Sequence, residues 1–126
     1  LLACHLLEEQ TRTTIAALAA DLGAELDDAI DRAAAGRAGA EAMSGLGWQE
    51  MMAAVAEGTG TYRSLYGRLV DEVPDPDDPR VIEIVAHEEA LTTFARAEAD
   101  GDPTAIDRLL AALSPAMRTE VTNACR

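Results

Sequence analysis

The chain contains no lysine, and this absence excludes several kinds of chemistry. All ten cationic residues are arginine, so Schiff-base catalysis, a P-loop lysine and a lysine general base cannot occur within the chain. Serine occurs only at Ser44, Ser64 and Ser114, and none of the three lies in the GxSxG pattern of a nucleophile elbow.

Aromatic residues are equally scarce. They make up 3% of the chain, whereas hydrophobic residues make up 48%, so the core must be built from alanine, leucine, valine, isoleucine and methionine. An alanine-rich chain with few aromatic and β-branched residues favours helices over sheets. No uncharged apolar run approaches the ~20 residues of a membrane span. A chain of 126 residues is expected to form one domain, covering residues 1–126.

Basic residues are outnumbered by acidic ones, 10 against 23, and the net charge is −13. This balance argues against binding to nucleic acid, which requires clustered cations. An anionic membrane surface would repel the chain for the same reason. We therefore expect neither nucleic acid nor membrane among the partners.

Only two cysteines are present, Cys4 and Cys125. The termini of an even-numbered antiparallel bundle share one end, so a disulfide between these residues is geometrically possible. The interpretation that we favour is two reduced thiols in a cytoplasmic protein. No signal peptide is visible, and the first residue is Leu1 rather than methionine, which leaves open a removed or omitted upstream segment.

Helical periodicity is the strongest pattern that is present. The first segment, residues 2–22, has an inward face at spacings of three and four that includes Thr11. Gly23 ends this helix, or residues 24–35 continue it. The glycine-rich stretch 36–47 is predicted to be a connector, with a short turn of helix around Ala42 as an option.

The most regular segment is residues 48–73. Its inward positions alternate spacings of four and three without a miss, as in the packing face of a long helix. These positions are Trp48, Met52, Val55, Thr59, Tyr62, Tyr66, Leu69 and Val73. Gly58 and Gly60 interrupt the segment and indicate either a kink or the close approach of another helix.

Two acidic residue–proline pairs predict the starts of further helices. Asp78 can cap a helix that has Pro79 in its first turn and spans 79–99, and Asp102 with Pro103 repeats the device. The last helix either kinks at the Ser114-Pro115 pair or is followed there by a separate one. Strand signals are absent. The predicted fold is all-α: an antiparallel up-and-down four-helix bundle, with a short extra C-terminal helix as an option.

Residues 81–91, VIEIVAHEEAL, raise the main functional question. This stretch holds one of the two histidines inside an otherwise apolar helical pattern. Helical spacing places His87 and Glu98 on the inward face and Glu88 at its edge. His87 is therefore either a metal or acid/base group, or a polar insertion in a packing face.

The sequence TYRSLYGRLVDEVPDPDDPRVIEIVAHEEALTTFARAE resembles the helical hairpin of the ferritin-like, rubrerythrin-type family. The resemblance covers roughly residues 48–100, with the Tyr-x-x-Leu-Tyr-x-x-Leu run, the acidic proline turn and the Ala-His-Glu-Glu-Ala-Leu segment as its motifs. In that family two metal ions are held by one glutamate from each of two helices and a Glu-x-x-His pair from each of the other two. The resemblance implies a ferritin-like arrangement and, with iron or manganese bound, a metal-dependent oxidoreductase.

The metal motif is incomplete in this chain. His87 would need a glutamate three residues earlier, where Ile84 stands, and Glu88 would need a histidine three residues later, where Leu91 stands. A dimetal site needs about four inward carboxylates, of which one or two can be placed. The primary expectation is therefore no cofactor. The candidate ligands for an iron or manganese site are His87, Glu88, Glu98, Glu8 and His5.

Two further interpretations of His87 do not require a metal centre of this kind. In the first, which we favour, a neutral histidine is hydrogen-bonded across the bundle to Glu98, Tyr62 or Tyr66 and fixes the helix register. In the second, Tyr62, Tyr66, His87 and Glu98 line a small-ligand or single-metal pocket between helices.

The function predicted from the sequence is a non-catalytic binding or assembly module. We expect a homodimer joined through an alanine-, methionine- and glycine-rich helical face, because a small bundle with long packing faces buries more apolar surface by self-association. The alternative is the metal-dependent oxidoreductase that the resemblance implies.

Overall fold

The computed structural model describes residues 2–24 and 32–124 of the chain. Every regular element in these residues is a helix, which confirms the predicted all-α class. The helices are α1 (Leu2–Asp21), α2 (Arg32–Met43), α3 (Trp48–Glu72), α4 (Pro79–Ala99), α5 (Ile106–Ala112) and α6 (Pro115–Ala124). None of these helices combines the length and the apolar character that crossing a membrane would require.

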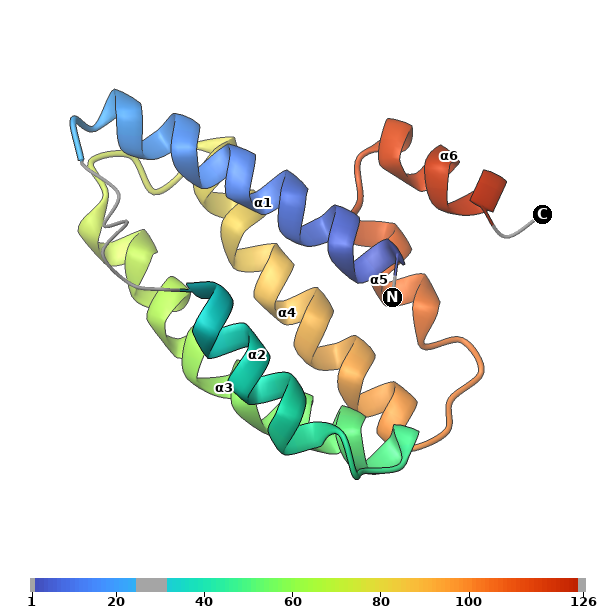
Figure 1. The fold of residues 1–126 in the computed structure, drawn as a ribbon. Coiled ribbons are helices and arrows are strands. Elements are labelled where there is room, and N and C mark those ends of the chain that lie inside the picture. Colours follow the sequence, from blue (N-terminus) through green and yellow to red (C-terminus); the bar gives the residue numbers. More distant parts are fainter. Residues whose placement is uncertain (1, 25–31, 125–126) are drawn as a thin grey trace.

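Helix α4 is the centre of the molecule. It lies between α1 and α3 and packs against both of them (Figure 1). Its buried residues therefore occupy more than one face, unlike those of a helix that is covered on one side only. Within the described residues, α1 and α3 lie on the two sides of α4 and make little direct contact with each other.

Contacts along α1 and α4 show that the two helices run antiparallel. Asp21 at the end of α1 binds Arg80 at the start of α4, with an Oδ2–Nη1 distance of 2.6 Å. Earlier residues of α1 contact later residues of α4, as the hydrogen bond from Thr14 to Glu83 shows. Helices α3 and α4 are also antiparallel, since a short turn joins them.

The predicted start of α4 is confirmed. The backbone N–H of Arg80 donates to Asp78 Oδ1 at 2.8 Å, and Pro79 occupies the first turn. The Arg80 guanidinium also donates to both carboxylate oxygens of Asp78. These side-chain bonds, more than any other contact, hold the pKa of Asp78 below its usual value.

Glycines with a left-handed backbone follow α1 and α4. Gly23 has φ +66° and Gly101 has φ +75°, a conformation that suits glycine because it has no Cβ. Gly23 thus follows the end of the first helix, as one of the two predicted alternatives stated. Residues 25–31, where the other alternative predicted a continuing helix, lie outside the described residues.

The predicted connector over 36–47 is wrong for most of its length. Residues 32–43 form α2, because six alanines favour the helix more strongly than Gly36 and Gly39 disfavour it. The described side chains between residues 34 and 42 of α2 are exposed, and Met43 is partly buried.

In the C-terminal region, one helix starts later than the sequence predicted. The predicted helix from Pro103 begins only at Ile106, because the Asp102 carboxylate accepts from the Thr104 backbone N–H at 2.8 Å and closes a turn first. At Ser114-Pro115 the chain starts the separate helix α6, the second of the two predicted options.

The core consists of two apolar clusters. The larger one includes Leu7, Phe94 and Leu109, and the smaller one is formed by Leu18, Val81 and Ile84. Each cluster takes residues from both α1 and α4. His87 and Thr11 are buried between them.

The predicted inward face of α3 is only partly buried. Met52 is in the core, Tyr66 and Leu69 pack against the smaller cluster, and Tyr62 is 57% exposed. The pattern overestimated this burial because α1 does not cover α3. The close approach of another helix at Gly58 and Gly60 is also wrong, since a Cβ added at either position meets no atom within 4 Å.

Cys4 is half-buried on α1. Cys125 lies outside the described residues, so a disulfide between the two stays a prediction. Burial raises the pKa of the Cys4 thiol above its ordinary value.

Candidate functional site

His87 is buried on α4 and is hydrogen-bonded to α1. Its Nδ1 lies 2.7 Å from the hydroxyl oxygen of Thr11, which is also buried. Because this pair lies between the two apolar clusters, it fixes the register of α1 against α4. His87 thus has a hydrogen-bond partner on a neighbouring helix, and this partner is Thr11 rather than one of the predicted residues.

The predicted partners of His87 lie elsewhere. Glu98 is about three turns further along the same helix, or ~16 Å at 1.5 Å per residue, and it accepts from Trp48 Nε1 at 2.6 Å. Tyr62 is exposed, and Tyr66 packs against the smaller apolar cluster. The prediction that Glu98 or Tyr62 binds His87 is wrong. Glu98 lies too far along the same helix, and the Tyr62 side chain on α3 is exposed rather than directed into the core.

Two carboxylates approach the other ring nitrogen of His87. Glu8 Oε1 and Glu88 Oε1 each lie 3.6 Å from Nε2. The Glu8 side chain is 61% exposed, whereas that of Glu88 is only 9% exposed. We call Glu8, Thr11, His87 and Glu88 the His87 cluster.

Glu88 carries the least satisfied atom of the cluster. Its Oε2 is fully buried and has no hydrogen-bond partner within the described part of the chain. Burial raises the pKa of Glu88; a charged His87 would oppose this rise, and the negative charge of Glu8 adds to it. The cluster therefore favours whatever neutralises Glu88, either a proton or a cation.

The tautomer of His87 follows from the same geometry. When the Thr11 hydroxyl donates to Nδ1, the proton of the neutral imidazole is on Nε2 and faces the two carboxylates. At 3.6 Å these contacts are too long to be full hydrogen bonds. His87 alone therefore does not satisfy Glu88.

The cluster does not fit the dimetal centre that the family resemblance implies. Ile84 and Leu91 occupy the positions where Glu-x-x-His pairs would need a glutamate and a histidine, and Ile84 is buried in the core. Of the other candidate ligands, His5 is exposed on α1, and Glu98 is hydrogen-bonded to Trp48. Across residues 2–24 and 32–124, no group of three or more histidine, cysteine, aspartate or glutamate side chains is arranged to hold a metal ion.

An apolar groove opens beside the smaller cluster, between α1 and α3. Its volume is about 290 Å³. We call it the α1–α3 groove; its apolar lining includes Ile15, Leu18, Leu22, Leu65, Tyr66 and Leu69, and Ile84 contributes from α4. Arg68 and Glu72 also line it.

The His87 cluster continues this groove along the same helix faces. Glu88 follows Ile84 by one turn of α4, and Thr11 precedes Ile15 by one turn of α1. Of the predicted pocket of Tyr62, Tyr66, His87 and Glu98, the structure thus places Tyr66 in the groove and His87 at its continuation. It does not bring Glu98 to them.

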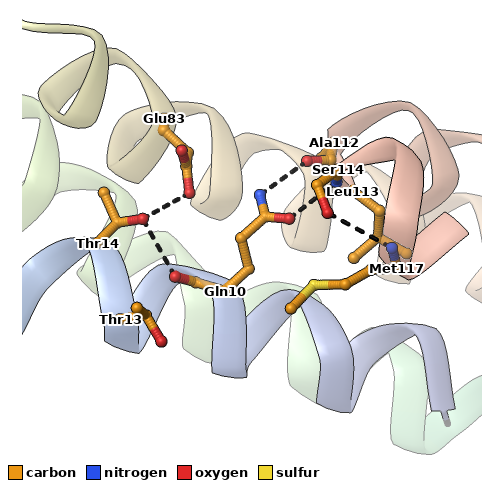
Figure 2. A pocket seen from close by; sticks show the side chains of 8 residues that line it. All are labelled: Gln10, Thr13, Thr14, Glu83, Ala112, Leu113, Ser114 and Met117. Atoms are coloured by element: carbon orange, nitrogen blue, oxygen red, sulfur yellow. Dashed lines mark hydrogen bonds between the residues drawn. The ribbon is translucent and has the colours of Figure 1, made fainter.

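A second hollow, of about 420 Å³, lies on the other side of α1 (Figure 2). Gln10 spans the turn between α5 and α6, donating to Ala112 O at 3.2 Å and accepting from the Ser114 backbone N–H at 2.8 Å. Thr14 donates to Glu83 in the same hollow, at 2.7 Å. Because these polar groups satisfy one another, the hollow is explained by the packing of α5 and α6 on α1.

The sequence contained a partial signal for this site. Thr11 was on the predicted inward face of the first helix, and Glu8 was among the candidate ligands. What the pattern could not predict is that Thr11 lies opposite His87, because no local rule relates residues on different helices.

Comparison with known proteins adds no functional assignment: no family model matches the chain, and neither the curated proteins nor the solved structures contain a significant match.

Proposed function

We propose that this protein is a non-catalytic binding module, an open helical bundle that receives a helix of a partner protein in the α1–α3 groove. One observation carries the proposal. Because α1 and α3 flank α4 with little contact between them, Leu22 and Leu65 of the groove remain 47% and 49% exposed. An amphipathic helix with an apolar stripe would bury these side chains, as in other helix-in-groove complexes.

The proposal includes the ferritin-like arrangement that the sequence resembles. Helices α1, α3 and α4 would supply three rods of a four-helix bundle, and the partner's helix would supply the fourth. Helix α2 is a poor fourth rod, since its 12 residues span ~18 Å. Helix α3, with 25 residues, is about twice as long.

A homodimer is the proposed assembly state. We place its contact on a face of α3 and α4 away from the groove, in place of the alanine-, methionine- and glycine-rich face expected from the sequence. A shallow hollow of about 590 Å³ there is lined by Val70, Ile82 and Val85, and Ile82 is exposed. Arg63 and Glu89 form an ion pair on this face, at 2.9 Å. The face is thus locally neutral, so a second copy could approach it without strong charge repulsion.

The alternative function is a metal-dependent oxidoreductase that uses the His87 cluster. The approach of Glu8 and Glu88 to Nε2 favours this function. Against it, the described residues contain no group of three or more histidine, cysteine, aspartate or glutamate side chains arranged to hold a metal ion. Elemental analysis of the purified protein, with thermal melts in Fe(II), Mn(II) and chelator, separates the two functions. Near-stoichiometric bound metal, together with a Tm that chelator lowers, would support the enzyme and contradict the binding module.

The small ligand and the cytoplasmic location expected from the sequence are both compatible with a binding module. A small ligand between the helices would occupy the same α1–α3 groove, and the cytoplasmic location stays a prediction.

The binding module is tested with a synthetic helical peptide that carries a leucine stripe and an uncharged, glutamine-rich polar face. We expect saturable binding by calorimetry, with backbone NMR shifts concentrated at groove residues such as Leu22 and Leu65. Leu65→Gln should weaken binding about tenfold or more, because it places an amide in an apolar contact. The matched control, Ile82→Gln, changes an exposed apolar residue on the other face and should leave the affinity unchanged.

Two results would contradict the binding module. One is an absence of binding at millimolar peptide, and the other is a set of NMR shifts that avoids the groove.

A further inference from the structure

We infer that the helix received by the α1–α3 groove is cationic, and that one of its lysine or arginine side chains binds between Glu8 and Glu88. This inference rests on the proposed function and adds the chemistry of the partner. It starts from Glu88, whose side chain is more than nine-tenths buried and whose Oε2 has no hydrogen-bond partner among the described residues. A buried carboxylate oxygen in this state is costly unless a donor from outside completes it.

The chain does not supply that donor within the part that the structure describes. The ion pairs of its arginines there are with Glu9, Asp21, Asp78, Glu89 and Asp102. Neither Glu8 nor Glu88 has an arginine partner among them. Two carboxylates therefore approach the His87 ring without an arginine beside them.

A helix lying in the groove would pass this position. Ile84 lines the groove, and Glu88 is on the next turn of α4, ~5.4 Å further along the axis. Glu8 reaches the same point from α1, with a side chain that is largely exposed and free to close over an incoming group. A long basic side chain can lay its methylene stem along the apolar groove and deliver its charged head to the two carboxylates.

Charge selects the class of partner. At the other end of the groove, Glu72 and the basic Arg68 both belong to the lining, whereas Glu8 and Glu88 have no arginine partner among the described residues. The net charge of −13 would in addition attract a basic helix at long range and repel an acidic one. A second copy of this chain is a poor occupant of the groove, because its acidic side chains would meet Glu8 and Glu88, which have no arginine partner among the described residues.

The experiment compares three synthetic peptides that share the leucine stripe and differ on the polar face, which carries lysine, glutamine or glutamate. Affinities are measured by calorimetry at two salt concentrations for the wild-type protein, Glu8→Gln, Glu88→Gln and Glu120→Gln. Glu120 is the matched control, an exposed glutamate on α6 whose replacement removes the same charge. Circular dichroism verifies that each variant is folded.

We expect the lysine peptide to bind about tenfold tighter than the glutamine peptide, and the glutamate peptide to bind weakest. Glu8→Gln and Glu88→Gln should each reduce the affinity for the lysine peptide about fivefold, because a close charge pair is lost. The affinity for the glutamine peptide should stay the same, because that peptide has no charge to pair with either glutamate. Glu120→Gln should change neither affinity by more than about twofold, since an exposed distant charge is screened by salt.

The outcomes separate this inference from the proposed function. If no peptide binds, the binding module itself fails and the inference fails with it. If the glutamine and lysine peptides bind equally, the groove stands and the cationic partner is wrong. If Glu120→Gln weakens the lysine peptide as much as Glu88→Gln does, only the net charge matters and the specific contact with Glu8 and Glu88 is wrong.

Discussion

At the scale of single residues, Glu88 and His87 differ in how completely their surroundings satisfy them. His87 has a short hydrogen bond to Thr11 through Nδ1. Glu88 has one carboxylate oxygen near the imidazole and the other buried without a donor in the described structure. His87 thus already has a hydrogen-bond partner, whereas Glu88 is the group whose surroundings a bound ligand or a proton would complete.

Replacing Glu88 by glutamine should stabilise the protein at neutral pH. The folded state raises the pKa of Glu88 above its ordinary value of 4.5, so it binds a proton more tightly than the unfolded chain does. Stability is consequently lost as the pH rises from that ordinary value through the higher pKa of the folded state. Glutamine is uncharged at every pH, so Glu88→Gln should gain about 1 kcal/mol at pH 7 and almost nothing at pH 4.

Urea denaturation at both pH values measures this difference, with Glu120→Gln as the control for loss of one exposed negative charge. A variant that is less stable than the wild type at pH 7 would show that the Glu88 carboxylate is satisfied in solution.

At the scale of helices, local signals were reliable where capping and periodicity agreed. The Asp78-Pro79 pair predicted the start of α4, and its range of 79–99 is the observed one. The glycines of residues 36–47 predicted a connector, but most of that stretch is helical because the alanines among them favour a helix. The burial of α3 was overestimated, because a regular pattern shows which face can pack and not how much of it is covered.

Gly60→Ala should stabilise α3. The added Cβ meets no atom within 4 Å, so the helix gains propensity without a clash, by about 0.5–1 kcal/mol. Gly23→Ala is the contrasting variant, and it should destabilise the protein because Gly23 has φ +66°. Thermal melts of the two variants should move in opposite directions; a lower Tm for Gly60→Ala would show that the position is in fact crowded.

At the scale of the whole molecule, the arrangement of α1, α3 and α4 leaves two distinct apolar surfaces. The α1–α3 groove leads to Glu8 and Glu88, which have no arginine partner among the described residues, and the α3–α4 face around Ile82 carries the Arg63–Glu89 ion pair. We propose a basic helix as the partner of the first surface and another copy of this chain as the partner of the second.

Sedimentation velocity tests the homodimer. We expect a species of twice 13.3 kDa at micromolar concentration, and its conversion to monomer by Ile82→Glu, since two like charges would meet across a symmetric contact. Leu65→Glu, on the groove side, is the control and should remain dimeric. A wild-type protein that sediments only as a 13.3 kDa species would dismiss the dimer and leave the groove unaffected.

The sequence by itself determined the all-helical class, the limits of α4 and the inward positions of Thr11 and His87. It could do so because capping, proline geometry and helical spacing act between residues that are close along the chain. Only the tertiary structure decided that Thr11 meets His87, that Glu8 and Glu88 converge on the same ring, and that α1 leaves α3 partly uncovered. Those results depend on how helices from distant parts of the chain are placed against one another, and no spacing within a single helix encodes that placement.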